Sequence, residues 1–158
     1  ELHRLARDGA SRDSLAPRPK AWSRLLRESG VDDAHLPEAL ARTQAAIDAF
    51  RRSALAAKLL DPAAQDAASE LAVTARLDGA VHGLRIDRSF VDEAGVRWIV
   101  DWKTSTHQGG DVEAFLDAEL ERYRGQLERY ARAMQQLEPG RELKVGIFFP
   151  LLDAWRGL

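Results

Sequence analysis

The sequence predicts an α/β domain in which a helical region precedes a mixed sheet. Two observations support this prediction. In residues 1–62 apolar side chains recur at spacings of three, four and seven, whereas within 69–150 most of them alternate with polar ones. One long stretch of helical spacing interrupts the second region. We therefore expect a three-stranded antiparallel meander, a crossover helix and a further strand, parallel to one of its neighbours.

The first sixty residues are predicted to form helices. A short amphipathic segment starts at Leu2, and the prolines of Ala16-Pro17-Arg18-Pro19 interrupt it. A second helix covers residues 21–28 and ends at Ser29-Gly30. A third begins near Pro37, where a first turn tolerates proline, and its apolar stripe continues to residue 57.

The strands of the meander follow residue 69. Residues 71–77 alternate in the manner of a half-buried strand, and Asp78-Gly79 is a strong signal for a two-residue hairpin turn. The second strand is expected over 80–90. After a turn at 92–95, the third strand is expected over 96–103.

A long helix and a last strand complete the domain. Gly109-Gly110 precedes a helix predicted over 111–137, with apolar residues at spacings of three and four. Pro139-Gly140 ends this helix, and residues 143–149 then alternate as a strand.

Size and composition limit the possible functions. The 158 residues fit one domain, and 45% hydrophobic with 30% charged residues is a globular composition. The net charge is −2, so a nucleic acid would have to bind a local basic patch. The lack of cysteine excludes disulfides, thiolate zinc sites, cysteine nucleophiles and iron–sulfur clusters.

Neither a membrane span nor a secretory leader is evident, because no apolar run approaches the roughly 18 residues that a span needs. We expect a cytoplasmic protein without a membrane partner. The chain starts at Glu1 without a methionine and stops soon after a strand-like stretch, so we also expect a fragment of a longer protein.

Two acids and a lysine in the second and third strands are the candidate chemical groups. Asp87 interrupts an apolar strand, and Asp101 and Lys103, two residues apart, project from one face of the next strand. A carboxylate in a buried strand needs a cation, which is either Lys103 alone or a divalent metal shared by both acids. Mg²⁺ prefers such oxygen ligands and assists phosphodiester hydrolysis, in which a nearby lysine can orient water, help deprotonate it or contact a phosphate oxygen.

The motifs around these residues resemble a known family. Gly83-x-x-Ile86-Asp87-Arg88, Ile99-Val100-Asp101-Trp102-Lys103-Thr104 and Gln126-Leu127-Glu128-Arg129-Tyr130 are similar to motifs of the PD-(D/E)xK nuclease domain of RecB/AddA-type helicase–nucleases. The resemblance is to a C-terminal domain of the exonuclease V beta-subunit type. The opening Leu2-His3-Arg4-Leu5 resembles the family's upstream histidine motif. The resemblance implies a restriction-endonuclease-like core and a single nuclease domain over 1–158, with its catalytic part in 69–150.

The resemblance also implies roles for individual residues. Asp87, Asp101 and Lys103 would be catalytic; His3, Asp87, Asp101 and the carbonyl of Trp102 would bind the metal; Gln126 and Tyr130 would lie near the site and the DNA. The cofactor would be Mg²⁺, for which Mn²⁺ can substitute, with no iron–sulfur cluster. Trp102 departs from the family pattern, which has tyrosine there, but this change leaves the backbone carbonyl in place.

The expected function is therefore a Mg²⁺-dependent DNA exonuclease module acting in repair and recombination. Its partners would be DNA, the helicase part of the parent chain and other helicase–nuclease subunits. The chain has no Gly-x-x-x-x-Gly-Lys-[Ser/Thr] loop, so a motor would lie upstream. The alternatives are a catalytically silent DNA-binding or subunit-docking module with the same fold, and a hydrolase of another phosphate ester.

Several residues also have a purely structural interpretation. Asp87 and Asp101 could pair with Arg85, Arg88 or Lys103, and His3 could be solvated near a chain end. Tyr123 and Tyr130 fit core packing. Glu70 is either a paired surface acid or a support for the site, and His35, His82 and His107 are expected on the surface. The basic residues Arg4, Arg7, Arg12, Arg18, Lys20, Arg24 and Arg27 are weak evidence for a DNA path.

Overall fold

The computed structural model describes residues 18–61, 63–105, 107 and 109–158. Its helices are α2 (Pro19–Glu28), α3 (Leu36–Arg52), α4 (Ala54–Leu59) and α5 (Val112–Leu137). Its strands are β1 (Gln65–Leu77), β2 (Ala80–Val91), β3 (Arg97–Trp102), β4 (Leu143–Phe149) and β5 (Ala154–Gly157). Within the described ranges, no helix has the length and apolar character needed to cross a membrane.

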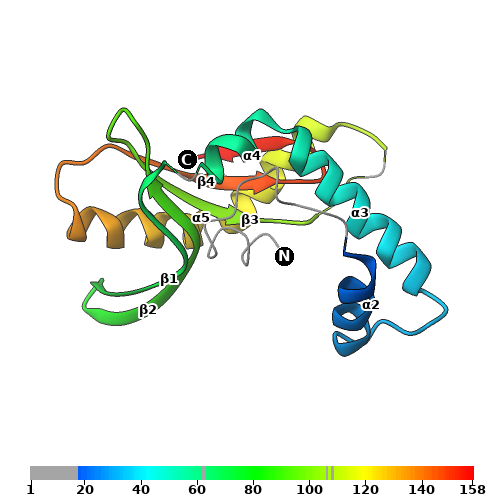
Figure 1. Cartoon of the computed structure of the whole chain (residues 1–158). Helices are drawn as coiled ribbons and strands as arrows, with labels where there is room; N and C mark the ends of the chain where they lie inside the picture. The colour runs from blue at the N-terminus through cyan, green and yellow to red at the C-terminus, as the bar shows by residue number, and fades with distance from the viewer. Residues whose placement is uncertain (1–17, 62, 106, 108) are drawn as a thin grey trace.

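The five strands form one mixed sheet in the order β1-β2-β3-β4-β5 (Figure 1). β1, β2 and β3 are the antiparallel meander, and β4 pairs with β3 in the parallel direction after the crossover through α5. The predicted α/β class, meander, crossover helix and parallel final pairing are confirmed. β5 was not predicted, because four residues are too few to show a period.

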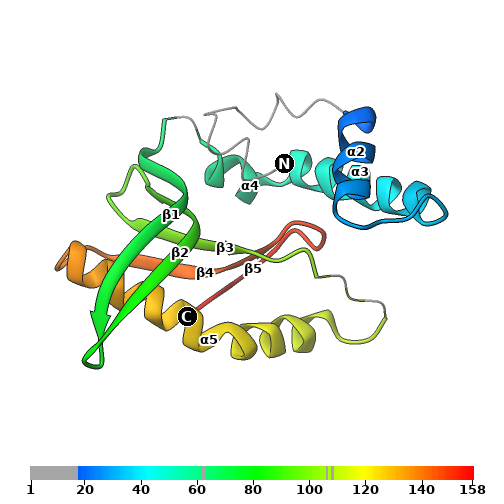
Figure 2. The same ribbon diagram turned by 90° about the horizontal axis from the view of Figure 1, so that it is seen from below.

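Helices cover both faces of the sheet, with α5 on one side and α3 and α4 on the other (Figure 2). Alternation along β3 assigns its side chains to these two layers. Ile99 joins the apolar cluster that contains Leu127 of α5, whereas Trp98 and Val100 join the cluster that contains Phe50 of α3. Asp101, which follows Val100, therefore faces α5.

The helical region differs from the prediction at Ser53. Apolar spacing indicated one helix up to residue 57, but the chain leaves helical geometry at Ser53 (φ −69°, ψ 126°) and α4 starts afresh. The buried Ser53 hydroxyl accepts a hydrogen bond from the backbone N–H of Ala56 at 2.9 Å, which caps α4. At the other end of α4, the Arg88 guanidinium donates to the Leu59 carbonyl at 3.1 Å.

The edge strand β5 packs closely on β4. Its register places Gly146 of β4 beside Gly157 of β5. A Cβ atom on Gly146 would lie 2.2 Å from the Arg156 carbonyl oxygen, so only glycine fits there. The Arg156 guanidinium also reaches across to Asp117 of α5 at 2.8 Å, which ties β5 to the crossover helix.

Candidate active site

Asp87 and Asp101 face each other where β2 and β3 part. Arg88 pairs with Val100 in the antiparallel register, and the next position on each strand is occupied by one of the two acids. The Asp101 side chain is only 2% exposed. Burial raises the pKa of Asp101, and the nearby Asp87 carboxylate raises it further, while the Lys103 ammonium opposes this change. The structure thus brings the two predicted acids together.

The path of β2 explains why Asp87 reaches this position. Ile86 packs in the cluster on the α5 side, whereas Phe90, four residues later and of the same parity, packs in the cluster on the α3 side. The strand therefore turns about its own axis near Asp87. Glu70 lies opposite this point on β1 and has a φ of 55°, which marks the local distortion. The Asp87 carboxylate accepts a hydrogen bond from the Trp102 backbone N–H at 2.9 Å.

A hydrogen-bond chain from α5 holds the Asp101 carboxylate. The Gln126 amide nitrogen donates to Oδ1 of Asp101 at 2.9 Å and to the Tyr130 hydroxyl oxygen at 2.8 Å. Tyr130 donates in turn to the Arg85 carbonyl at 2.6 Å. Gln126 and Tyr130 are one helical turn apart, so both reach the site from the same face of α5. The structure places both predicted residues beside Asp101.

Lys103 forms an ion pair with Asp101. Its Nζ lies 2.5 Å from Asp101 Oδ2 and 4.5 Å from the centre of the Tyr123 ring. Burial lowers the pKa of Lys103, but the Asp101 carboxylate outweighs this effect, with smaller contributions from Tyr123 and Asp87, so the pKa lies above its usual value. Lys103 is therefore an ammonium at neutral pH. It can donate hydrogen bonds and stabilise negative charge.

The oxygen atoms of this site suit a hard divalent cation. Asp101 Oδ2 is buried, and its close partner in the described part of the chain is the Lys103 ammonium at 2.5 Å. No three Asp, Glu, His or Cys side chains gather as a metal cluster among the described residues. Two carboxylates suffice for Mg²⁺, which keeps several waters, but they do not make a four-ligand zinc site.

The other predicted metal ligands are His3 and the Trp102 carbonyl. His3 lies outside the described residues. The Trp102 backbone N–H donates its hydrogen bond to the Asp87 carboxylate. The Trp102 indole packs on the other face of the sheet, with its ring centre 6.0 Å from that of Phe50 and 5.8 Å from that of Phe148. Tryptophan in place of the family's tyrosine therefore adds to the apolar core and leaves the site's polar surroundings unchanged.

A family model described as the PD-(D/E)XK nuclease superfamily matches residues 2–153, nearly the whole chain. The chain belongs to the PD-(D/E)XK nuclease superfamily. A search of curated proteins found no match. The fold of this superfamily member agrees with the predicted restriction-endonuclease-like core, and the match indicates a nuclease in general.

Three further residues of this nuclease domain adjoin the site. Core packing alone would explain Tyr123, but its ring also makes a cation–π contact with the Lys103 ammonium. Glu119 is 8% exposed and accepts a hydrogen bond at 3.1 Å from Ser105, just beyond β3. Glu70 forms an ion pair with Arg85 at 2.9 Å. Glu119, Tyr123, Gln126 and Tyr130 lie at helical spacings of four, three and four, a signal that could have identified the whole face.

The remaining histidines do not join the two acids. His35 is exposed and bonds Asp32 at 2.7 Å, as expected of a surface residue. His82 pairs with Ala75 near the hairpin end and is half-buried. His107 is half-buried: its ring stacks on Phe115 with centroids 4.8 Å apart, and its Nε2 atom is buried.

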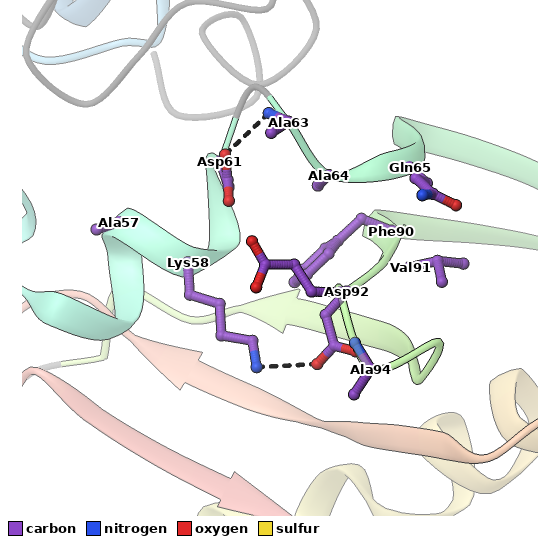
Figure 3. Close-up of a pocket in the computed structure, with 11 residues that line it drawn as sticks. Ala57, Lys58, Asp61, Ala63, Ala64, Gln65, Phe90, Val91, Asp92 and Ala94 are labelled. Atoms are coloured by element: carbon purple, nitrogen blue, oxygen red, sulfur yellow. Dashed lines mark hydrogen bonds and ion pairs between the residues drawn. The ribbon is translucent and has the colours of Figure 1, made fainter.

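A cavity of about 500 Å³ lies away from the acids, beside α4 and the β2–β3 turn (Figure 3). Lys58 and Asp92 meet in it at 2.9 Å. Hydrogen bonds from Lys58 and Trp98 lower the pKa of Asp92 to about 2. Asp92 also accepts hydrogen bonds from the backbone N–H groups of Ala94 and Val96, so its carboxylate stabilises the turn.

Proposed function

We propose that the chain is a Mg²⁺-dependent deoxyribonuclease domain that hydrolyses phosphodiester bonds. The observation that supports this most strongly is the apposition of Asp87 and Asp101 with Lys103 in ion-pair contact. Two carboxylates forced together in a buried setting repel each other, and a divalent cation between them would relieve that repulsion. In this proposal Asp87, Asp101 and the Trp102 carbonyl hold the metal, with His3 as a further ligand.

Each residue of the proposed site has a distinct task. When bound, Mg²⁺ would acidify a water and neutralise charge on the phosphate. Gln126 fixes the orientation of Asp101 through its hydrogen bond to Oδ1. The Lys103 ammonium donates to a phosphate oxygen or to the attacking water, and the Tyr123 ring restricts its movement. These tasks suit attack of water on a DNA phosphate.

The parent protein is proposed to be a RecB/AddA-type helicase–nuclease of DNA repair and recombination. The support is the joint presence of the Ile86-Asp87-Arg88, Asp101-Trp102-Lys103 and Gln126-to-Tyr130 motifs. In this assembly the chain is the single exonuclease domain, and the helicase part and other subunits deliver the DNA strand. The retention of both acids and the lysine favours catalysis over a silent DNA-binding or docking module.

Cleavage of end-labelled single-stranded DNA tests the proposal. One oligonucleotide is labelled at its 5′ end and another at its 3′ end, and each is incubated with the chain in Mg²⁺, Mn²⁺ or a chelator. We expect slow, metal-dependent release of short products from one end, because a chain of net charge −2 binds DNA weakly without its parent. Metal-independent DNA binding without cleavage in either metal would favour the docking module instead.

A further inference from the structure

The helix α5 carries two flanks of arginines that differ in their surroundings. Gln126 points toward Asp101 and so marks the side of the helix that borders the site. At 3.6 residues per turn, Arg122 and Arg129 project about 40° and 60° from the Gln126 direction, both to the same side, once full turns are removed. Arg124 and Arg132 project about 160° and 120° from the Gln126 direction, farther from the site. The two pairs carry equal charge on the same element.

The far flank is neutralised within the protein. Arg124 forms hydrogen bonds with the Glu121 carboxylate, one of them at 2.9 Å. Arg132 binds Asp78 in the β1–β2 turn through two nitrogens, at 2.7 and 2.9 Å. The charges of these two arginines are therefore balanced by carboxylates of the protein itself.

The flank beside the site is not neutralised in this way. Arg122 has only a 3.5 Å contact with Glu119, and its side chain is 69% exposed. Arg129 is exposed and forms no ion pair with any described residue. The Arg122 guanidinium lies 5.5 Å from the centre of the Tyr123 ring, the same ring that holds the Lys103 ammonium. Positive charge that is only weakly paired thus begins directly at the site.

The spacing of this flank matches a nucleic-acid strand. Seven residues separate Arg122 from Arg129, which at 1.5 Å per residue is about 10 Å along the helix. At about 3.4 Å per nucleotide in a helical strand, that distance spans roughly three nucleotides. Guanidinium groups suit phosphate oxygens because they can donate two parallel hydrogen bonds. Positive charge here would also offset the repulsion between the site's carboxylates and the DNA backbone.

We propose that Arg122 and Arg129 bind backbone phosphates of a DNA strand on either side of the bond that is cleaved, so that this flank of α5 sets the path of the strand. This inference rests on the proposed nuclease function and adds the surface that holds the substrate. The far flank, with Arg124 and Arg132, has no part in binding.

Two double variants of equal charge test the assignment. Arg122→Gln/Arg129→Gln removes the proposed contacts, and Arg124→Gln/Arg132→Gln is the matched control on the same helix. The affinity of each variant for a single-stranded 20-nucleotide DNA is measured in Ca²⁺ at several salt concentrations. For a single strand, the slope of log K against log salt falls by about 0.7 for each lost phosphate contact. Circular dichroism confirms that both variants are folded.

For the site-flank variant, we expect the slope of log K against log salt to fall by about 1.4 and the DNA affinity to fall several-fold. The control variant should keep the wild-type slope. In Mg²⁺, the site-flank variant should raise KM for DNA more than it lowers kcat. Equal losses in both variants would mean that net charge alone attracts the DNA, and no loss in either would place the strand elsewhere. Both results overturn the inference. Neither affects the nuclease proposal, which depends on whether the wild-type chain cleaves DNA at all.

Discussion

Replacing Asp101 by asparagine should abolish cleavage while preserving the fold. The amide is nearly isosteric, and its oxygen can still accept the Gln126 hydrogen bond that now measures 2.9 Å. It removes one of the two charges that would hold Mg²⁺, a cation that gives up its waters reluctantly. The metal's activated water and its stabilisation of the phosphate should both be lost. We expect the cleavage rate to fall at least about 10³-fold, which corresponds to about 4 kcal/mol of barrier.

The effect on stability should be much smaller. Exchanging a charged for a neutral acceptor weakens the bond from Gln126 by about 1 kcal/mol. Lys103 loses its partner but keeps the Asp87 carboxylate nearby. Against these losses, the pKa of Asp101 is raised by burial, so its ionised form destabilises the fold at neutral pH and the amide removes that cost. The net change should stay within about 1 kcal/mol, or about 4 °C in Tm.

The assay is a nuclease time course in Mg²⁺ beside a DNA-binding titration in Ca²⁺ and a thermal unfolding curve. Asp153→Asn is the matched control, because this exposed residue has a φ of 46°, which asparagine tolerates. We expect the control to cleave as the wild type does. Near-wild-type cleavage by Asp101→Asn would refute the reasoning, since Asp101 would then not be a metal ligand.

Three further substitutions test the surroundings of the site. Gln126→Leu should lower cleavage about 10- to 100-fold by releasing the buried site carboxylate, whereas Gln135→Leu on the exposed side of α5 should not. Gly146→Ala should lower the free energy of unfolding by about 3 kcal/mol or more, because its Cβ would meet the Arg156 carbonyl; an unchanged Tm would contradict the close packing of β5. Asp92→Asn should cost about 1 kcal/mol or more at neutral pH, measured by denaturant unfolding. Because the pKa of Asp92 is about 2 in the fold against an ordinary value of 3.8, this stability difference should be full above about pH 4 and vanish as the pH falls through 2.

The periodic elements were predictable because burial imposes their pattern on the sequence. The strand over Leu143–Phe149 and the helix ending at Leu137 have the predicted bounds, since alternation and the Pro139-Gly140 stop are local signals. The break at Ser53 was missed because the apolar stripe continues across it, and only the extended backbone of that residue reveals the new helix. Tertiary contacts there override a regular local pattern.

The candidate site was partly visible in the sequence. The spacing of Asp101 and Lys103 predicted a shared face, and their contact in the structure follows from strand alternation. The meeting of Asp87 with Asp101 depends on register and on the twist of β2, which no local pattern encodes. Tyr123 was missed as a site residue because an aromatic side chain in an apolar stripe looks the same whether or not a lysine rests on it.

Binding of Mn²⁺ tests most directly whether Asp87 and Asp101 form one metal site. Electron paramagnetic resonance follows free Mn²⁺ as it is titrated into the wild-type chain, Asp87→Asn and Asp101→Asn, all without DNA. The account predicts that the wild type removes Mn²⁺ from solution and that each single substitution weakens this binding at least about tenfold, because both carboxylates contact the same ion. Undiminished Mn²⁺ binding by either variant would contradict it.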